Sequence, residues 1–381
     1  MRRAGVAAMV LLLSACGTDS APASTTAGSV QRFASAAGEL EVTTVATGLE
    51  HPWGLAFLPD GRMLVTERPG RLRVLDASGV LSEPLEGVPA VAASGQGGLL
   101  DVAVDPDFRD NNWIYLSFAE PGSGGAGTAV ARARLEGSAL HDLTVIFSQQ
   151  PKVGGGHHFG SRLVFDRQGR LFISSGDRQV WPNVQALDKG QGKIFRIERD
   201  GSVPADNPFN GRDDAQPAIW SLGHRNIQGA ALHPETGELW QTEHGPRGGD
   251  ELNIARAGRN YGWPLITYGV NYDGTPVGSG GKDMEGMQQP LHQWTPSIAP
   301  SGLAFYTHDR FPAWRGNLFV GALAYRLLAR LELEGERVVH EERLLTDLGE
   351  RIRDVRQGPD GYLYLLTDAP NGRLLRVGLV R

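Results

Sequence analysis

Short apolar runs alternate with polar turns along the chain, and this pattern dominates everything after about residue 39. The recurring unit is an apolar run, a turn containing Asp-Gly or an equivalent pair, and a second apolar run, as in residues 54–61 followed by residues 62–66. Glycine accepts the positive φ that tight hairpin turns require, so each unit predicts a β-hairpin. Amphipathic helical periodicity is almost absent, which indicates an all-β protein.

The hairpin unit recurs six times at intervals of roughly 50 to 70 residues, the range of propeller blades with loop insertions. The copies begin at Gly54, Asp101, Arg162, Gly229, Gly302 and Asp354. We therefore predict a six-bladed β-propeller of four-stranded antiparallel sheets over residues 39–381, because a closed ring of blades leaves few exposed strand edges. A pair of β-sandwiches would explain the strands but not their recurrence.

The first 38 residues follow a different pattern, that of an export signal and a linker. Arg2 and Arg3 precede an apolar run at residues 6–13, which is too short to span a bilayer as a helix. The run ends in Leu-Ser-Ala-Cys, and Cys16 is the only cysteine of the chain. The motif predicts a lipoprotein signal peptide at residues 1–15 and a flexible tether at residues 16–38 that begins with lipidated Cys16. The alternative is an ordinary secretory signal with an incidental cysteine.

Composition and charge narrow the possible partners. The lipoprotein interpretation predicts an extracytoplasmic, membrane-anchored protein whose only membrane contact is the lipid. A single cysteine excludes an internal disulfide framework and a Cys-based zinc site. The formal net charge of −6 argues against nucleic acid as a partner, since that binding depends on basic patches.

Polar clusters precede four of the six units, at equivalent positions of the expected blades. They lie around Gln96, His158, Arg225 and Arg351. Equivalent positions in a ring of blades converge on one axis, so these residues are expected to form one site.

The residue types of this expected site suggest acid–base chemistry and anion binding. His157 and His158 are candidates for a general base because imidazole titrates near neutral pH, and Asp177 could orient such a base. Arg225 and the pair Arg351 and Arg353 could bind a polyanion through forked hydrogen bonds. From the residue types alone, structural histidines and solvated surface arginines are open alternatives.

A separate cluster at residues 243–251 combines glycine and proline with two acidic residues, Asp250 and Glu251. Exposed backbone carbonyls and carboxylates are the oxygen ligands that calcium prefers. An acidic surface loop is an equally good account of this composition.

Six ordered motifs in these clusters closely resemble the soluble PQQ-dependent glucose and aldose sugar dehydrogenases of the glucose/sorbosone dehydrogenase family (PQQ is pyrroloquinoline quinone). The motifs are GQGGLLDVAVDPDF from Gly95, HFGSRLVFD from His158, LGHRNIQG from Leu222, EHGPRGGDELN from Glu243, NYGWP from Asn260 and RIRDVRQGPDGYLYLLTD from Arg351. The resemblance extends from about Glu41 to the C-terminus.

The resemblance implies a role for each matching residue. His158 matches the catalytic base, and Asp177 matches its carboxylate partner. Arg225 matches the arginine beside the quinone carbonyl, Asn226 matches its cofactor-binding neighbour, and Gln96 matches a residue that lines the cofactor and sugar. Tyr272 matches a contact beneath the cofactor ring, and Arg351 and Arg353 match the pair that binds the PQQ carboxylates. Gly245 and Pro246 match carbonyl ligands of a calcium that touches PQQ, and Glu251, Tyr261 and, more weakly, Asp250 match ligands of a second calcium.

The resemblance thus predicts an enzyme that oxidises aldose sugars at the anomeric carbon to lactones with PQQ and calcium, and that passes electrons to an unidentified acceptor. One position departs from the family pattern, because Ala324 stands where members commonly carry a lysine that contacts the cofactor. Arg326, two residues on, would face the same side if the strand continued. The alternatives are a calcium-dependent propeller lactonase or esterase, and a non-catalytic binding propeller.

Overall fold

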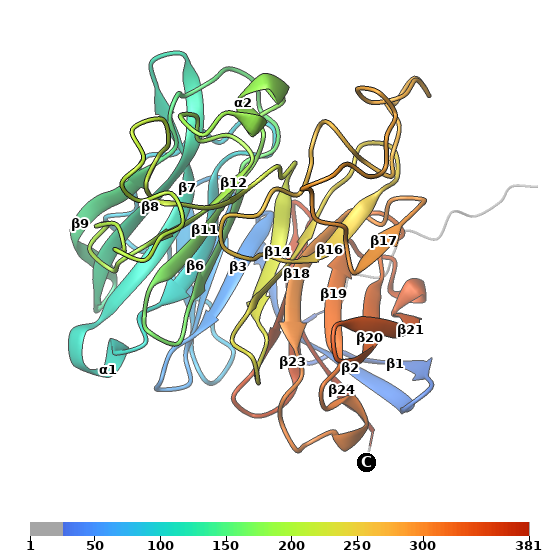
Figure 1. Cartoon of the computed structure of the whole chain (residues 1–381). Coiled ribbons are helices and arrows are strands. Elements are labelled where there is room, and N and C mark those ends of the chain that lie inside the picture. Colours follow the sequence, from blue (N-terminus) through green and yellow to red (C-terminus); the bar gives the residue numbers. More distant parts are fainter. Residues whose placement is uncertain (1–25, 381) are drawn as a thin grey trace, which may run out of the picture.

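The computed structural model describes residues 26–380, which form six antiparallel β-sheets arranged as blades around a central axis (Figure 1). Blade 1 holds β3 (Pro52–Phe57), β4 (Met63–Glu67) and β5 (Arg71–Leu75), and blade 2 holds β6 (Leu99–Val104), β7 (Trp113–Gly122), β8 (Gly125–Glu136) and β9 (Ala139–Ser148). Blade 3 holds β10 (Gly160–Phe165), β11 (Leu171–Ser175), β12 (Lys193–Ile197) and β13 (Ile219–Leu222).

The remaining blades follow in chain order. Blade 4 holds β14 (Ile227–Leu232), β15 (Leu239–Glu243), β16 (Asp250–Ile254) and β17 (His292–Trp294), and blade 5 holds β18 (Pro300–Phe305), β19 (Leu318–Ala322), β20 (Leu328–Glu334) and β21 (Arg337–Leu344). Blade 6 holds β22 (Ile352–Gln357), β23 (Leu363–Thr367) and β24 (Gly372–Leu379), completed by β2 (Gly38–Leu49) and β1 (Val30–Ser35). Short helical segments are α1 (Phe108–Asn111), α2 (Trp181–Gln185), η1 (Pro312–Trp314) and η2 (Thr346–Leu348).

The predicted six-bladed propeller is confirmed, with two differences in strand number. Blade 1 has three strands, and Leu75 forms only an isolated bridge with Leu81 where a fourth strand would lie. Blade 6 has five, because the N-terminal β2 pairs with the C-terminal β24 and closes the ring (Figure 1). This pairing covers strand edges that would otherwise be open at both chain ends.

The folded body begins earlier than expected. Val30–Ser35 pairs in register with residues 38–43 of β2, so the tether predicted for residues 16–38 is too long at its C-terminal end. The predicted signal peptide and Cys16 lie outside the described residues. Within residues 26–380, none of the helices has the length and apolar character needed to cross a membrane.

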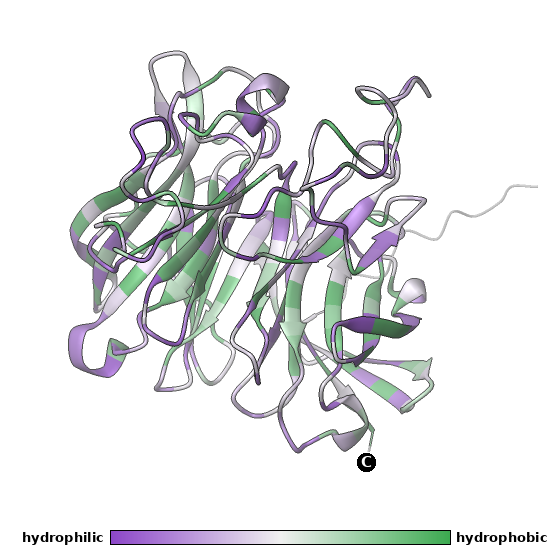
Figure 2. Cartoon of the chain, in the orientation of Figure 1, coloured by the Kyte–Doolittle hydropathy of each residue, from purple (hydrophilic) through white to green (hydrophobic). Residues whose placement is uncertain are grey.

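Hydrophobic residues are concentrated in the strands and hydrophilic residues in the connecting loops (Figure 2). All five residues of β4, β11, β15 and β23 are buried, because a middle strand is covered on both faces by neighbouring blades. The core clusters therefore join pairs of blades, as where Leu64 and Leu72 of blade 1 pack with Leu116 of blade 2. This double burial explains why the sequence shows continuous apolar runs instead of strict alternation.

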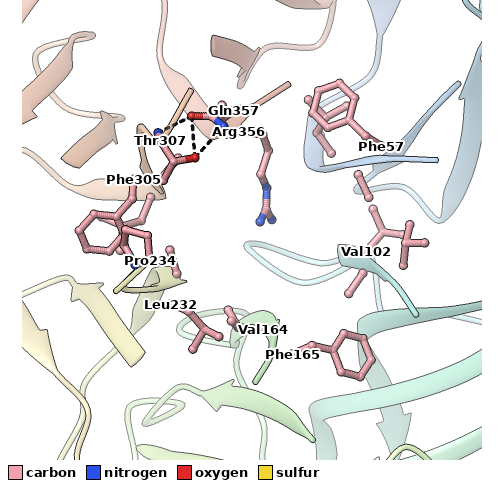
Figure 3. Close-up of a pocket in the computed structure, with 17 residues that line it drawn as sticks. Phe57, Val102, Val164, Phe165, Leu232, Pro234, Phe305, Thr307, Arg356 and Gln357 are labelled. Atoms are coloured by element: carbon pink, nitrogen blue, oxygen red, sulfur yellow. Dashed lines mark hydrogen bonds between the residues drawn. The ribbon is translucent and has the colours of Figure 1, made fainter. Parts of the chain in front are cut away.

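The first strand of each blade lies at the axis, and its two ends face two different cavities. The starts of these strands and the loops before them line one cavity, here called the upper cavity. Their last residues line the lower cavity, of about 470 Å³, in which apolar side chains such as Phe57, Val102 and Leu232 surround Arg356 (Figure 3).

Four charged side chains lie between the two cavities, and we call them the axial ion network: Asp101, Arg162, Asp354 and Arg356. Arg162 Nη1 lies 3.0 Å from Asp101 Oδ1 and 3.1 Å from Asp354 Oδ1. Arg356 contacts the same two carboxylates, each at 3.0 Å. The Arg162 guanidinium also stacks 4.4 Å from the ring of Trp53, which lines the upper cavity. The network thus joins blades 2, 3 and 6.

Candidate active site

The upper cavity has a volume of about 270 Å³ and a predominantly polar lining drawn from five blades. Its lining residues are Trp53, Arg68, Gln96, Asn226, Gln228, His244, Ala299, Leu323, Ala324, Arg351, Arg353 and Asp368. Four of the residues expected from the sequence, Gln96, Asn226, Arg351 and Arg353, are therefore brought together although they are far apart in the chain.

A buried histidine–aspartate pair stands beside this cavity. His158 Nδ1 lies 2.7 Å from Asp177 Oδ1, and both side chains are buried. The backbone of His158 has a φ of +56°, which turns the chain sharply before β10, and its N–H donates to Gln96 Oε1 at 2.8 Å. The pairing expected between His158 and Asp177 is thus present in the structure.

Asp177 is fixed by donors from two directions. Trp263 Nε1 donates to its Oδ2 at 2.8 Å, and the Gln179 backbone N–H donates to its Oδ1 at 2.8 Å. The carboxylate is therefore available as the acceptor for a hydrogen on His158 Nδ1. That arrangement leaves the Nε2 lone pair of a neutral imidazole free to accept a proton.

The electrostatic surroundings favour neutral His158. Burial lowers its pKa from the usual 6.5, and the charge of nearby Arg225 lowers it further, whereas the hydrogen bond that His158 donates to Asp177 raises it. A histidine with a lowered pKa remains a base at neutral pH.

Arg225 and Asn226 connect this pair to blade 4. The Arg225 backbone carbonyl accepts the Asp177 N–H at 2.8 Å, and its guanidinium lies 5.2 Å from the ring of Trp263. Asn226 Oδ1 accepts the N–H of Gly160 at 3.1 Å. Arg225 and Asn226 therefore lie next to His158, as expected.

Arg351 and Arg353 extend from the start of blade 6 toward Asp368. Their Nη2 atoms lie 3.2 and 2.9 Å from Asp368 Oδ2, and His51 Nδ1 lies 3.0 Å from its Oδ1. Burial opposes the ionisation of Asp368, but Arg353, His51 and Arg351 together hold its pKa well below the usual range. Asp368 is therefore an anion shared by two arginines.

A second, much smaller cavity lies below the loop of residues 243–251 and is lined by Glu243, Gly245, Glu251 and Tyr261, among others. Burial raises the pKa of Glu251 to about 8, with a further contribution from the negative charge of Glu243. No group of three or more His, Cys, Asp or Glu side chains within residues 26–380 is arranged to hold a metal. Any metal here would therefore rely on backbone carbonyls as well as these carboxylates.

Three of the expected calcium ligands have other roles or positions. Asp250 accepts hydrogen bonds from Gly245 N–H, Ser297 Oγ–H and Ala299 N–H at 2.6–2.8 Å, so its oxygens already have donors. The Tyr261 hydroxyl accepts the Arg256 N–H at 2.8 Å and donates to the Ile254 carbonyl. Pro246, expected with Gly245 at the calcium that touches PQQ, lines neither the upper nor the small cavity.

Two further expectations differ from the structure. Tyr272 is 75% exposed and does not line the upper cavity, so it is not part of this cluster. Arg326 does not continue the strand, because β19 ends at Ala322 and both Tyr325 and Arg326 adopt positive φ in the following turn. Arg326 Nη1 instead donates to the Gly349 carbonyl at 3.0 Å.

Several lining residues were not expected from the sequence. Trp53 lies just before unit 1, and Gln96 likewise lies shortly before unit 2. Position relative to the repeat could therefore have indicated that Trp53 lines the cavity. Arg68, His244 and Asp368 follow the second strand of their blades, as Asp177 does in blade 3. Comparing these turns across the repeats would have found all three.

The chain is similar to known proteins over most of its length. It matches the glucose/sorbosone dehydrogenase family over residues 49–376. It is 50% identical to aldose sugar dehydrogenase YliI of Escherichia coli (strain K12) over 343 residues, which is 89% of this chain and 92% of the relative. It is 29% identical to quinoprotein glucose dehydrogenase B of Acinetobacter calcoaceticus, over 88% of this chain and 87% of that protein.

Solved structures agree with this similarity. The apo-form of the soluble aldose sugar dehydrogenase from Escherichia coli has 49% identity and a TM-score of 0.87, covering 90% of this chain and 100% of the other. The PQQ-bound aldose sugar dehydrogenase from Streptomyces coelicolor has 30% identity and a TM-score of 0.74, covering 89% and 98%. The chain therefore belongs to the glucose/sorbosone dehydrogenase family and is a sugar dehydrogenase.

Proposed function

We propose that this enzyme oxidises aldose sugars at the anomeric carbon to lactones, with PQQ in the upper cavity and His158 as the base. The observation that carries the proposal is the buried His158–Asp177 pair beside a cavity lined by arginines. The relatives named above include a quinoprotein and a PQQ-bound aldose sugar dehydrogenase, which supports this cofactor.

Unpaired polar atoms around the upper cavity fit an acceptor-rich ligand. Arg225 Nε, Asn226 Nδ2 and Arg353 Nε are buried and have no hydrogen-bond partner in the structure. Buried donors without partners are costly, and oxygen atoms of a ligand would satisfy them. PQQ carries three carboxylates, so Arg353 and Arg351 are suited to hold it, and when bound it would supply the two-electron acceptor.

The protein's own residues would accept the proton and stabilise the charges that develop during the reaction. His158 Nε2 would accept the proton of the anomeric hydroxyl, while Asp177 stabilises the imidazolium that forms. A positioned general base contributes roughly 10²- to 10⁴-fold in rate. Arg225 would place a positive charge where negative charge develops during the reaction.

Calcium is the metal that the small cavity suits best. Glu251 supplies a hard carboxylate, and the buried oxygens Gln241 Oε1 and Asn253 Oδ1 nearby have no hydrogen-bond partner in the structure. A cation there would offset the burial and the repulsion from Glu243 that together raise the pKa of Glu251. The Gly245 carbonyl is a further candidate ligand, and such mixed oxygen sets are typical of calcium.

Reconstitution tests the proposal. Purified apoprotein is supplied with PQQ and calcium, and dye reduction is followed with glucose. We expect activity only with both additions, with His158→Gln inactive and His157→Ala, an exposed neighbour, close to wild type. Dye reduction without PQQ, or full activity of His158→Gln, would contradict the proposal. Lactone hydrolysis would favour the lactonase alternative, against which the family assignment already argues.

We also propose that Cys16 carries a lipid that anchors the enzyme outside the cytoplasm. Support comes from the motif alone, since Cys16 is the only cysteine and ends a short apolar run. We expect Cys16→Ser to leave the membrane fraction without loss of activity. A wild-type protein that incorporates no labelled palmitate would refute the anchor.

A further inference from the structure

Positive charge at the upper cavity exceeds the negative charge that the protein supplies. Three guanidinium groups, those of Arg68, Arg351 and Arg353, line the cavity, and Asp368 is the only carboxylate among its lining residues. Arg351 and Arg353 share that carboxylate. A cavity with such an imbalance favours an anionic ligand.

Arg68 is the cation of this group that lacks a carboxylate partner. It forms no ion pair with any residue in the described part of the chain, and neighbouring Glu67 is instead paired with Arg71 and Arg73 at 2.8 and 3.4 Å. Within residues 26–380 its guanidinium donates one hydrogen bond, from Nη1 to the Gly95 carbonyl at 3.1 Å. That bond holds the side chain beside Gln96, and the remaining donors of the guanidinium are available to a ligand.

Arg68 is also close to the other two arginines. It occupies the turn between β4 and β5, the turn that in blade 6 carries Asp368. The positive charges of Arg351 and Arg68 both contribute to lowering the pKa of Arg353, although burial is the main cause. Three like charges held at one cavity repel each other, and a ligand with several carboxylates would relieve that repulsion.

The blade 5 wall of the cavity supplies no such charge. Ala324 and Leu323 line it from the turn between β19 and β20, and Arg351 Nη1 donates to the Leu323 carbonyl at 3.2 Å. Arg326 is turned away toward the Gly349 carbonyl, so it does not substitute for a cation at position 324. Cations therefore reach the cavity from blades 1 and 6, and none comes from blade 5.

We propose that Arg68 binds a carboxylate of the cofactor and is a determinant of cofactor affinity, acting from blade 1 together with Arg351 and Arg353. This inference rests on the proposed function, because it requires PQQ in the upper cavity. A competing role is available, since Arg68 also lines an adjacent hollow of about 290 Å³ with Glu50 and His51, where it could contact the sugar instead.

Calorimetric titration of apoprotein with PQQ at saturating calcium tests the inference without using activity. A charge-assisted hydrogen bond to a carboxylate corresponds to about 10- to 150-fold in affinity, so we expect Arg68→Ala to raise Kd by that range. Arg68→Gln can keep a hydrogen bond to the Gly95 carbonyl while it removes the charge, and we expect a similar loss. Thermal melts of each variant show whether the fold is kept.

Two further variants sharpen the test. Arg326→Ala is the matched control, because it removes an arginine from the neighbouring blade that does not line the cavity, and we expect less than about a twofold change. Combining Arg68→Ala with Ala324→Lys adds a cation on the blade 5 wall of the cavity, and we expect it to recover part of the lost affinity.

The outcomes separate this inference from the function on which it rests. Wild-type protein that binds no PQQ would overturn both. Wild-type binding with unchanged Kd in Arg68→Ala and Arg68→Gln would overturn the inference alone. A higher KM for sugar with unchanged PQQ affinity would assign Arg68 to the adjacent hollow. An equal loss in Arg326→Ala would show a general charge effect, which also contradicts a specific contact.

Discussion

Replacing Arg162 by methionine would measure what the axial ion network contributes to stability. Arg162 is 2% exposed, and its partners Asp101 and Asp354 are 0% and 1% exposed. Removing one partner of a buried ion pair typically costs about 3–5 kcal/mol, because a buried charge is left uncompensated. Arg356 still contacts both carboxylates, so we expect the lower end of this range.

The assay is thermal unfolding followed by circular dichroism. With an unfolding entropy of about 2.1 cal/mol/K per residue, a loss of about 3 kcal/mol lowers Tm by about 4 °C in a chain of this length. Arg62→Met is the control, since it breaks an exposed pair with Asp60 and should cost less than about 1 kcal/mol. Adding Asp101→Asn to Arg162→Met restores charge balance and should recover part of the loss. A Tm for Arg162→Met equal to that of wild type would refute the reasoning.

Three other changes probe the site. In Asp177→Asn we expect a lower kcat and an acid limb of the kcat/KM profile that moves to lower pH. The reason is that the hydrogen bond to Asp177 raises the pKa of His158, the base. A shift of the acid limb to higher pH would contradict this. Trp263→Phe leaves a buried oxygen of Asp177 without its donor. We therefore expect a loss of about 1–3 kcal/mol in the free energy of unfolding, together with a lower kcat. An unchanged Tm would contradict this expectation. In chelator-treated protein, stability should fall as pH rises from 4.5 toward 8, because the raised pKa of Glu251 favours the folded state only while the group is protonated. Calcium should abolish this slope, and equal slopes with and without calcium would exclude a cation at the small cavity.

The sequence predicted the propeller and the main site residues because both follow from the repeat. Each hairpin unit begins with the axial strand of its blade, so polar residues just before the units had to meet at one end of the axis. Gln96, Asn226, Arg351 and Arg353 were found in this way. The pairing of His158 with Asp177 was suggested by the residue types and by the family resemblance, and it agrees with the geometry.

The residues that the sequence misplaced lie where the repeat gives no information. Tyr272 belongs to the long insertion between β16 and β17, whose path is set by local turns. Arg326 follows β19 in a turn where two non-glycine residues adopt positive φ. Positive φ is usually indicated in a sequence by glycine, and this turn has none at those two positions. Val30–Ser35 resembles a linker in composition, and its strand conformation depends on pairing with β2.

Ring closure by β2 places a time constraint on folding. Gly48 N–H donates to Asn371 Oδ1 across 323 positions of the sequence, and β2 pairs with β24 along most of its length. At a synthesis rate of about 5–20 residues per second, the partner of β2 emerges about 16–65 s after β2 itself. During that interval the apolar edge of β2 is open to pairing with other chains. Blade 6 is therefore the blade that can close only after both ends of the chain are available.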